Sequence, residues 1–239
     1  MGLFEILKGE QPGLIKSLLH YENVGQYGEY LTEYALLSRS MEGYYVVLKN
    51  LYLPMKGKTT EIDLLMIHEK GIFVFESKNY SGWIFGNEHQ KYWTQLLDYG
   101  KEKHRFYNPV MQNAGHIQAI RQSLPQNPDI PIYSVIVFFG SSEFKNITCH
   151  ANNTFIIYPH SIQRVVSEIL TQPNAVFGNK YEIMDLFTKA VQNGYDPLIV
   201  ASQINSAAYY GRNTPQSTYY TIFGSLFRRG GFSFRRRFW

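Results

Sequence analysis

Two carboxylates and a lysine interrupt an otherwise apolar part of the chain, and their types and spacing could support metal-dependent chemistry. Asp63, Glu76 and Lys78 lie in the segment 60–79, which reads as two apolar strands joined by a tight turn. Charges inside such a strand pair are costly unless they are paired or bind a metal. Carboxylates that face each other across two strands have Cβ atoms about 5 Å apart, so they can hold a divalent ion between them. An ammonium group beside that ion can steer or activate a water molecule.

The turn of this hairpin decides which charges face each other, and two registers are open. A turn at Glu69–Lys70 places Asp63 opposite Glu76, whereas a turn at Lys70–Gly71 places Asp63 opposite Lys78. The second register puts the glycine in a turn position that tolerates positive φ, which tight hairpins require. Both registers put the three charges on one face, because alternate residues of a strand share a face.

Apolar residues surround these charges on both faces of the predicted hairpin. The face away from the charges is expected to hold Ile62, Leu64, Met66, Phe73 and Phe75. The charged face is apolar nearer the turn, where it holds Leu65, Ile67, Ile72 and Val74. Two apolar faces favour a covered central strand pair over the alternative, a simple salt bridge on a solvated edge.

The elements that must position this hairpin follow an α/β order. Helices are predicted at 29–37, 109–124, 159–170, 181–192 and 197–209, and further strands at 44–53, 92–96, 132–139 and 154–158. Asn108 followed by Pro109 is a typical helix start, with proline at the first helical position. This order predicts an α/β fold with a mixed β-sheet core flanked by helices on both faces. We divide the chain into a lead-in (1–24), a core (25–140), a segment that completes the sheet and adds helices (141–210), and a tail (211–239).

Composition narrows the class of protein. Of the 239 residues, 44% are hydrophobic, which is typical of a globular chain, and no apolar run is long enough to predict a membrane span. Cys149 is the only cysteine, so neither an internal disulfide nor a cysteine-based zinc site is possible. The N-terminus does not resemble a signal peptide. We expect a cytoplasmic protein.

The net charge of +4 comes from the tail. The segment 197–239 contains six arginines and no acidic residue, interspersed with tyrosine and phenylalanine. Positive charge combined with aromatic rings is typical of sequence-tolerant binding to nucleic acid, and the candidate contacts are Arg228, Arg229, Arg235, Arg236 and Arg237. A solubilising end and an anionic membrane surface remain as alternatives.

An ordered series of motifs runs along the chain. It comprises Gly25, Gly28 and Glu29, then Ile62-Asp63, Gly71–Asn79, Gly82 and Trp93, and finally Asn108-Pro109, Gln112 and His116. This series resembles the NERD domain, the nuclease-related domain of the PD-(D/E)XK nuclease superfamily. The resemblance extends from about Gly25 to Phe139, roughly half of the chain. It implies a restriction-endonuclease-like core.

The resemblance also implies phosphodiester hydrolysis with Mg²⁺ or Mn²⁺. By position in the motifs, the metal ligands would be Asp63, Glu76 and the carbonyl of Ser77. Lys78 would position or help deprotonate the attacking water. Glu29 matches an acid that reaches the site from the first helix, and Gln112 matches a polar residue that orients near the lysine.

Other residues of the series are expected to have ordinary roles. His116 shares a helix face with Gln112, but an exposed helix would show the same spacing, so no role is assigned to it. Tyr92 and Trp93 are expected to pack in the core.

The leading hypothesis is a metal-dependent nuclease acting on DNA. The alternatives are a non-catalytic nucleic-acid-binding module and a partner-binding domain on the same fold, since the fold alone does not separate them. A homodimer would suit cleavage of both strands of a duplex.

Overall fold

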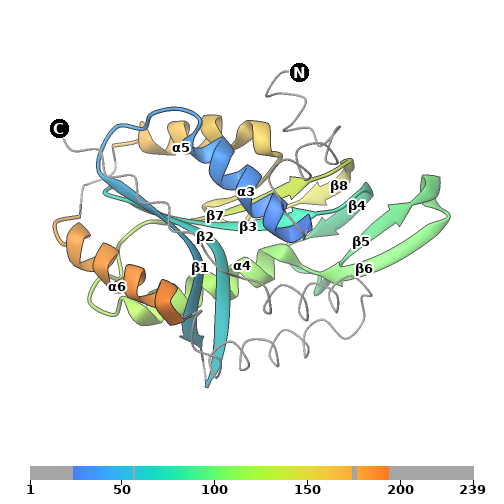
Figure 1. Ribbon diagram of the computed structural model, residues 1–239. Coiled ribbons are helices and arrows are strands. Elements are labelled where there is room, and N and C mark those ends of the chain that lie inside the picture. Colours follow the sequence, from blue (N-terminus) through green and yellow to red (C-terminus); the bar gives the residue numbers. More distant parts are fainter. Residues whose placement is uncertain (1–23, 56, 174–176, 194–239) are drawn as a thin grey trace.

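Two β-sheets and four α-helices make up the part of the chain that the computed structural model describes, residues 24–55, 57–173 and 177–193 (Figure 1). The helices are α3 (Val24–Leu37), α4 (Pro109–Ser123), α5 (Ile162–Leu170) and α6 (Lys180–Gln192). The strands are β1 (Tyr45–Met55), β2 (Lys58–His68), β3 (Gly71–Asn79), β4 (Gly82–Asn87), β5 (Tyr92–Leu97), β6 (Glu102–Tyr107), β7 (Ile132–Phe139), β8 (Ser142–Thr148) and β9 (Thr154–Ile157).

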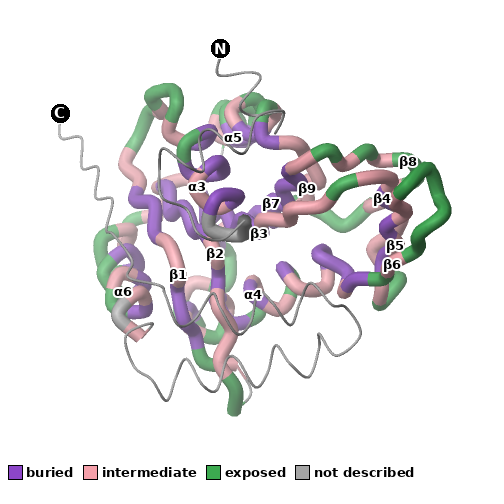
Figure 2. The backbone as a smooth tube through the Cα atoms, turned by 45° about the vertical axis from the view of Figure 1, so that its right-hand side comes forward, coloured by how far each residue is buried: buried purple, intermediate pink, exposed green. Residues whose placement is uncertain are grey.

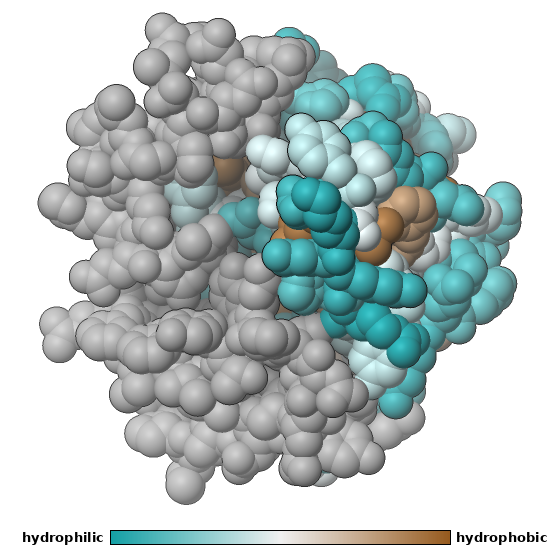
Figure 3. Space-filling model, turned by 90° about the vertical axis from the view of Figure 1, so that its right-hand side faces the viewer, coloured by the Kyte–Doolittle hydropathy of each residue, from teal (hydrophilic) through white to brown (hydrophobic). Residues whose placement is uncertain are grey.

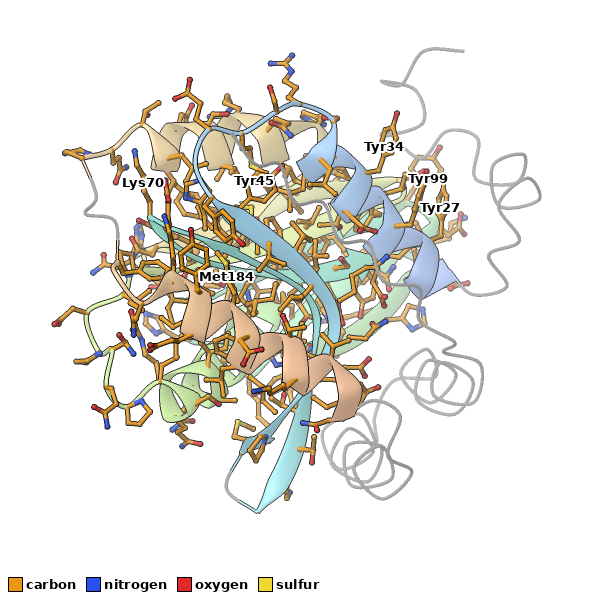
Figure 4. The ribbon with its side chains drawn as sticks, turned by 60° about the vertical axis from the view of Figure 1, so that its left-hand side comes forward. Tyr27, Tyr34, Tyr45, Lys70, Tyr99 and Met184 are labelled. Atoms are coloured by element: carbon orange, nitrogen blue, oxygen red, sulfur yellow. The ribbon has the colours of Figure 1, made fainter. Side chains whose placement is uncertain are left out.

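The larger sheet is mixed and is covered on both faces. Its order is β1-β2-β3-β7-β9, with antiparallel pairs from β1 to β3 and parallel pairs from β3 to β9. Helices α3 and α5 pack on one face, and α4 and α6 pack on the other. Figure 4 shows Met184 on the side of α6 that faces the sheet. The predicted α/β fold with helices on both faces is therefore confirmed.

The central hairpin adopts the first of the two registers. His68 pairs with Gly71, so the turn lies between them, and continuing the register places Asp63 opposite Glu76. Position 71 has no room for a larger side chain, because a Cβ atom there would lie 2.8 Å from the ring of Tyr133. The sequence left both registers open, and the pairing of His68 with Gly71 decides between them.

Strands β1 and β2 are irregular where Asp63 lies. The register pairs Lys49 with Leu64 and Leu51 with Ile62, and the pair between them is missing. Asn50 at that point has a positive φ of 54°, a conformation that asparagine tolerates better than most residues. The prediction that Ile62 lies on the face away from the charges was wrong. Ile62 packs in the same core cluster as Leu65, because the regular alternation of faces breaks at this kink.

The smaller sheet has the order β6-β5-β4-β8, and three of its strands were not predicted. The sequence indicated only the strand at 92–96. β6 and β8 are largely exposed and polar, so they lack the alternating apolar pattern that identifies a strand. Figure 2 shows the contrast between the buried β3 and β7 and the exposed outer end of the smaller sheet.

Trp93 anchors the smaller sheet. Its side chain is fully buried, its indole N–H donates a 2.9 Å hydrogen bond to the carbonyl of Asn87, and its ring stacks on Phe138 of β7. Gly86 lies against the indole, where a Cβ atom would approach to 2.3 Å, so only glycine fits. The prediction that Trp93 packs in the core is confirmed.

Several predicted segments lie outside the described residues. These are residues 1–23 of the lead-in, the helix at 197–209 and the basic aromatic tail with its arginines. No described helix combines the length and the apolarity needed to cross a bilayer.

We expect the buried imidazole of His68 to make the stability of the protein depend on pH. His68 is 1% exposed and its Nε2 lies 2.7 Å from the carbonyl of Glu42, while burial lowers the pKa of the imidazole. As the pH falls through about 6.5, the unfolded chain takes up a proton that folded His68 resists, so the free energy of unfolding decreases.

Urea unfolding at about pH 7.5 and about pH 5.5 checks this expectation. His68→Gln should reduce the pH dependence, whereas the same change at the partly exposed His104 should not. An equal loss of stability in the wild type and His68→Gln would contradict the assignment.

Candidate active site

Glu76, Lys78 and Gln112 form a closed triangle of hydrogen bonds at the end of β3 farthest from the turn. The Glu76 side chain is almost completely buried. Its Oε1 accepts hydrogen bonds from Lys78 Nζ at 2.7 Å and from Gln112 Nε2 at 2.8 Å. Gln112 Oε1 in turn accepts from Lys78 Nζ at 2.9 Å. A glutamine can donate and accept at once, so Gln112 holds both charged partners in place.

His116 secures the other oxygen of Glu76. Its Nε2 lies 3.0 Å from Glu76 Oε2, and its Nδ1 lies 2.8 Å from Thr60 Oγ1 on β2. His116 is buried, so the alternative of an exposed helix face does not apply at this position. The spacing in the sequence placed His116 on the same side of α4 as Gln112, but it did not show that this side is buried against β2 and β3.

Asn108 fixes the start of α4, and hence the position of Gln112. Its Oδ1 accepts a 2.9 Å hydrogen bond from the backbone N–H of Val110, which is an N-cap. Its Nδ2 donates to the carbonyls of Asn87 and Gln90 in the β4–β5 turn. The helix beginning predicted at Asn108 and Pro109 is confirmed, and the same asparagine ties α4 to the smaller sheet.

Asn113 attaches α4 to the larger sheet beside the site. Its Nδ2 donates to the Val74 carbonyl at 3.0 Å and to Ser134 Oγ at 2.8 Å. The side chain is fully buried. These bonds join α4 to β3 and β7, the two strands that pair alongside Glu76 and Lys78.

Asp63 approaches the same point from β2. Its Oδ2 accepts a 3.2 Å hydrogen bond from the backbone N–H of Ser77, and the Ser77 hydroxyl lies 3.1 Å from Thr32 Oγ1 on α3. Burial raises the pKa of Asp63 well above its ordinary value, and the neighbouring carboxylates of Glu76 and Glu29 raise it further. Glu29 on α3 therefore lies close enough to act on Asp63 electrostatically.

Glu76 and Lys78 form an ion pair. Burial alone would raise the pKa of Glu76, but Lys78 and His116 outweigh it and hold the value at about 2. Burial would lower the pKa of Lys78, and the negative charge of Glu76 reverses that effect and raises it. Lys78 is thus a cation at neutral pH that donates hydrogen bonds.

The donors at this site fit a hard divalent cation. Asp63, Glu76 and the Ser77 carbonyl offer oxygen atoms, the ligands that Mg²⁺ and Mn²⁺ prefer. Burial is the main cause of the raised pKa of Asp63, and the negative charges of Glu76 and Glu29 add to it; a bound cation would offset these charges. Among the described residues, no three His, Cys, Asp or Glu side chains stand in a ready metal-holding arrangement, so a ligand set here would combine two side chains with the backbone carbonyl.

Sequence reasoning from the motifs selected residues that the fold does bring together: Asp63, Glu76, Lys78, Gln112, Ser77 and Glu29. It did not select Thr60 and Asn113. The sequence around Thr60 shows no motif. Nothing in the sequence of α4 marks Asn113 as the residue whose side chain points toward the larger sheet.

The two sheets and their helices form an α/β fold that is consistent with a nuclease-like domain. Residues 24–139 match the family model of the nuclease-related domain, NERD. The chain therefore carries a nuclease-related domain, which is consistent with the PD-(D/E)XK superfamily.

A curated relative is the uncharacterized protein pXO1-01 of Bacillus anthracis, with 34% identity over 142 residues, 59% of this chain. The chain covers 65% of the length of that relative. No solved structure matches the chain significantly.

Proposed function

We propose that the nuclease-related domain hydrolyses phosphodiester bonds of nucleic acid, with DNA as the substrate, in a reaction that requires Mg²⁺ or Mn²⁺. The observation that supports this function is the convergence of Asp63, Glu76, Lys78 and Gln112, from β2, β3 and α4, on one point. A lysine that is only 17% exposed and lies between a carboxylate and an amide is not needed to stabilise a sheet, because removing charge from water is costly.

Each residue of the site would have a distinct role in the reaction. A bound divalent ion supplies Lewis acidity and lowers the pKa of a coordinated water. Asp63, Glu76 and the Ser77 carbonyl would hold that ion. Lys78, kept protonated by Glu76, would donate a hydrogen bond to the attacking water or to a phosphoryl oxygen and offset negative charge in the transition state. Gln112 would hold the Lys78 ammonium in the direction of the substrate.

Metal removal gives the direct test. The purified protein is incubated with labelled linear and circular DNA, single- and double-stranded, in Mg²⁺, in Mn²⁺ or in EDTA. We expect cleavage with either metal and none in EDTA, and we expect Asp63→Asn, which keeps the size of the side chain, to be inactive. Loss of circular substrate would identify an endonuclease. Cleavage in EDTA, or full activity of Asp63→Asn, would contradict the proposal.

A second candidate is a non-catalytic nucleic-acid-binding module. It is favoured by one observation: both carboxylate oxygens of Glu76 already accept hydrogen bonds from Lys78, Gln112 or His116. This function predicts binding that weakens with salt but no metal-dependent product in the same assay.

A further inference from the structure

The smaller sheet presents an outer face that the candidate active site does not use. Alternation along β4, β5 and β6, together with their register, places the following residues on this face: Trp83, Phe85, Tyr92, Thr94, Leu96, Lys103, Arg105 and Tyr107. The opposite face, with Ile84, Trp93 and Phe106, packs with Ile136 and Phe138 of β7. We call the first set the outer face of the smaller sheet.

Aromatic rings on the outer face are accessible and lie beside cations. Trp83, Phe85, Tyr92 and Tyr107 are all only partly buried. Tyr92 was expected to pack in the core, but it is only partly buried. Lys91 Nζ lies 5.5 Å and the Arg105 guanidinium 5.2 Å from the centroid of its ring. Lys145 Nζ lies 5.0 Å from the centroid of Trp83.

The positive charge of the outer face is exposed. Lys91, Lys103, Arg105 and Lys145 are all exposed, and Lys145 is paired with Glu143 of β8. The β5–β6 hairpin that carries two of them projects from the body of the molecule (Figure 1). The described residues at that end of the molecule are mainly hydrophilic, with apolar side chains among them (Figure 3).

We propose that this outer face binds single-stranded nucleic acid, with bases stacked on Tyr92 and Trp83 and phosphates near Arg105 and Lys103. Base faces become available to protein rings only when the bases are unpaired and unstacked. Partly exposed rings with adjacent cations supply both stacking and phosphate neutralisation. An apolar protein partner would instead meet several solvated charges. This inference rests on the proposed function, to which it adds the class of substrate.

The connections of the sheet make this surface relevant to the active site. β3, which carries Glu76 and Lys78, continues through a two-residue link into β4. β6 continues through Asn108 directly into α4, which carries Gln112. A strand held on the outer face is therefore bound by the elements that immediately precede and follow the candidate catalytic residues.

The test measures binding without cleavage. The full chain in EDTA is titrated into a fluorescein-labelled single strand of about 20 nucleotides, longer than the about 4–16 nucleotides that a single-strand-binding OB fold covers. A duplex of the same sequence is measured in parallel by fluorescence anisotropy. We expect Tyr92→Ala and Arg105→Glu each to raise the Kd for the single strand about fivefold or more, because each removes a stacking or phosphate contact. Arg105→Glu should also make the salt dependence less steep by about one unit.

A matched control separates this surface from general charge effects. Arg39→Glu makes the same charge change at an exposed position after α3 and should change the Kd less than about twofold.

Wild-type affinity in both surface variants, or a duplex bound as tightly as the single strand, would overturn the inference. Active cleavage that needs Asp63, combined with unaltered binding by the surface variants, would leave the proposed function standing and remove this inference alone. Binding that depends on Tyr92 and Arg105 without any cleavage would support the inference and reject the nuclease.

Discussion

Replacement of Lys78 by alanine is expected to reduce metal-dependent cleavage by about 10²–10³-fold, the usual cost of removing one preorganised donor from a transition state. The Lys78 ammonium lies 2.7 Å from Glu76 Oε1 and 2.9 Å from Gln112 Oε1. It is therefore already positioned, and little free energy is needed to reorganise it in the transition state. The rate of cleavage of labelled DNA at saturating Mg²⁺ measures the effect. Because Glu76 keeps its bonds to Gln112 and His116, we expect the variant to remain folded.

Lys189→Ala is the matched control for this prediction. Lys189 is exposed on α6 and forms an ion pair with Asp185 one helical turn away, so its loss should leave the rate within about twofold of the wild type. A thermal unfolding curve for each variant separates loss of chemistry from loss of fold. A folded Lys78→Ala protein with undiminished activity would rule out the role given to Lys78.

Replacement of Trp93 by alanine should cost about 3–5 kcal/mol of unfolding free energy, the range for truncating a buried large aromatic side chain. The indole is fully buried and stacks on Phe138, so its removal leaves a cavity between the two sheets. The 2.9 Å hydrogen bond to the carbonyl of Asn87 is lost as well. Urea unfolding at neutral pH gives the difference in free energy.

Trp83→Ala provides the comparison within the same sheet. Trp83 lies on the opposite, partly exposed face of β4, so its truncation opens no enclosed cavity and should cost clearly less than that of Trp93. Equal losses for the two tryptophans would show that Trp93 does not anchor the smaller sheet as described.

The residues of the candidate site could be selected from the sequence because charges in apolar strands are rare and costly. Asp63, Glu76 and Lys78 stand out against apolar neighbours, and the series that resembles the NERD domain added Glu29, Ser77 and Gln112. The start of α4 at Asn108 and Pro109 could also be predicted from the sequence, because helix capping and the preference for proline at the first helical position are local effects.

The register of the hairpin could not be chosen from the sequence. Both turns were compatible with local conformational preferences, and the choice depends on packing between strands, such as the close approach of Tyr133 on β7 to Gly71 on β3. Such a contact exists only after the sheet has formed. The kink at Asn50 and Asp63 escaped prediction for the same reason, because alternation rules assume a regular strand.

The role of His116 and the existence of the smaller sheet were decided by tertiary structure. His116 became part of the site because α4 lies across β2 and β3, which brings Thr60 and Glu76 to its two ring nitrogens. The polar strands β6 and β8 are held by neighbouring strands and by the burial of Trp93 and Phe144 rather than by their own periodicity.

By itself, the sequence determined the α/β class, the apolar core of the central hairpin and the chemical types available at the site, because these depend on composition and local order. Only the tertiary structure decided which of those groups meet. The hydrogen bonds of Glu76 to Gln112 and His116 join residues that are 36 and 40 positions apart, and no local rule specifies contacts between elements that far apart in the chain.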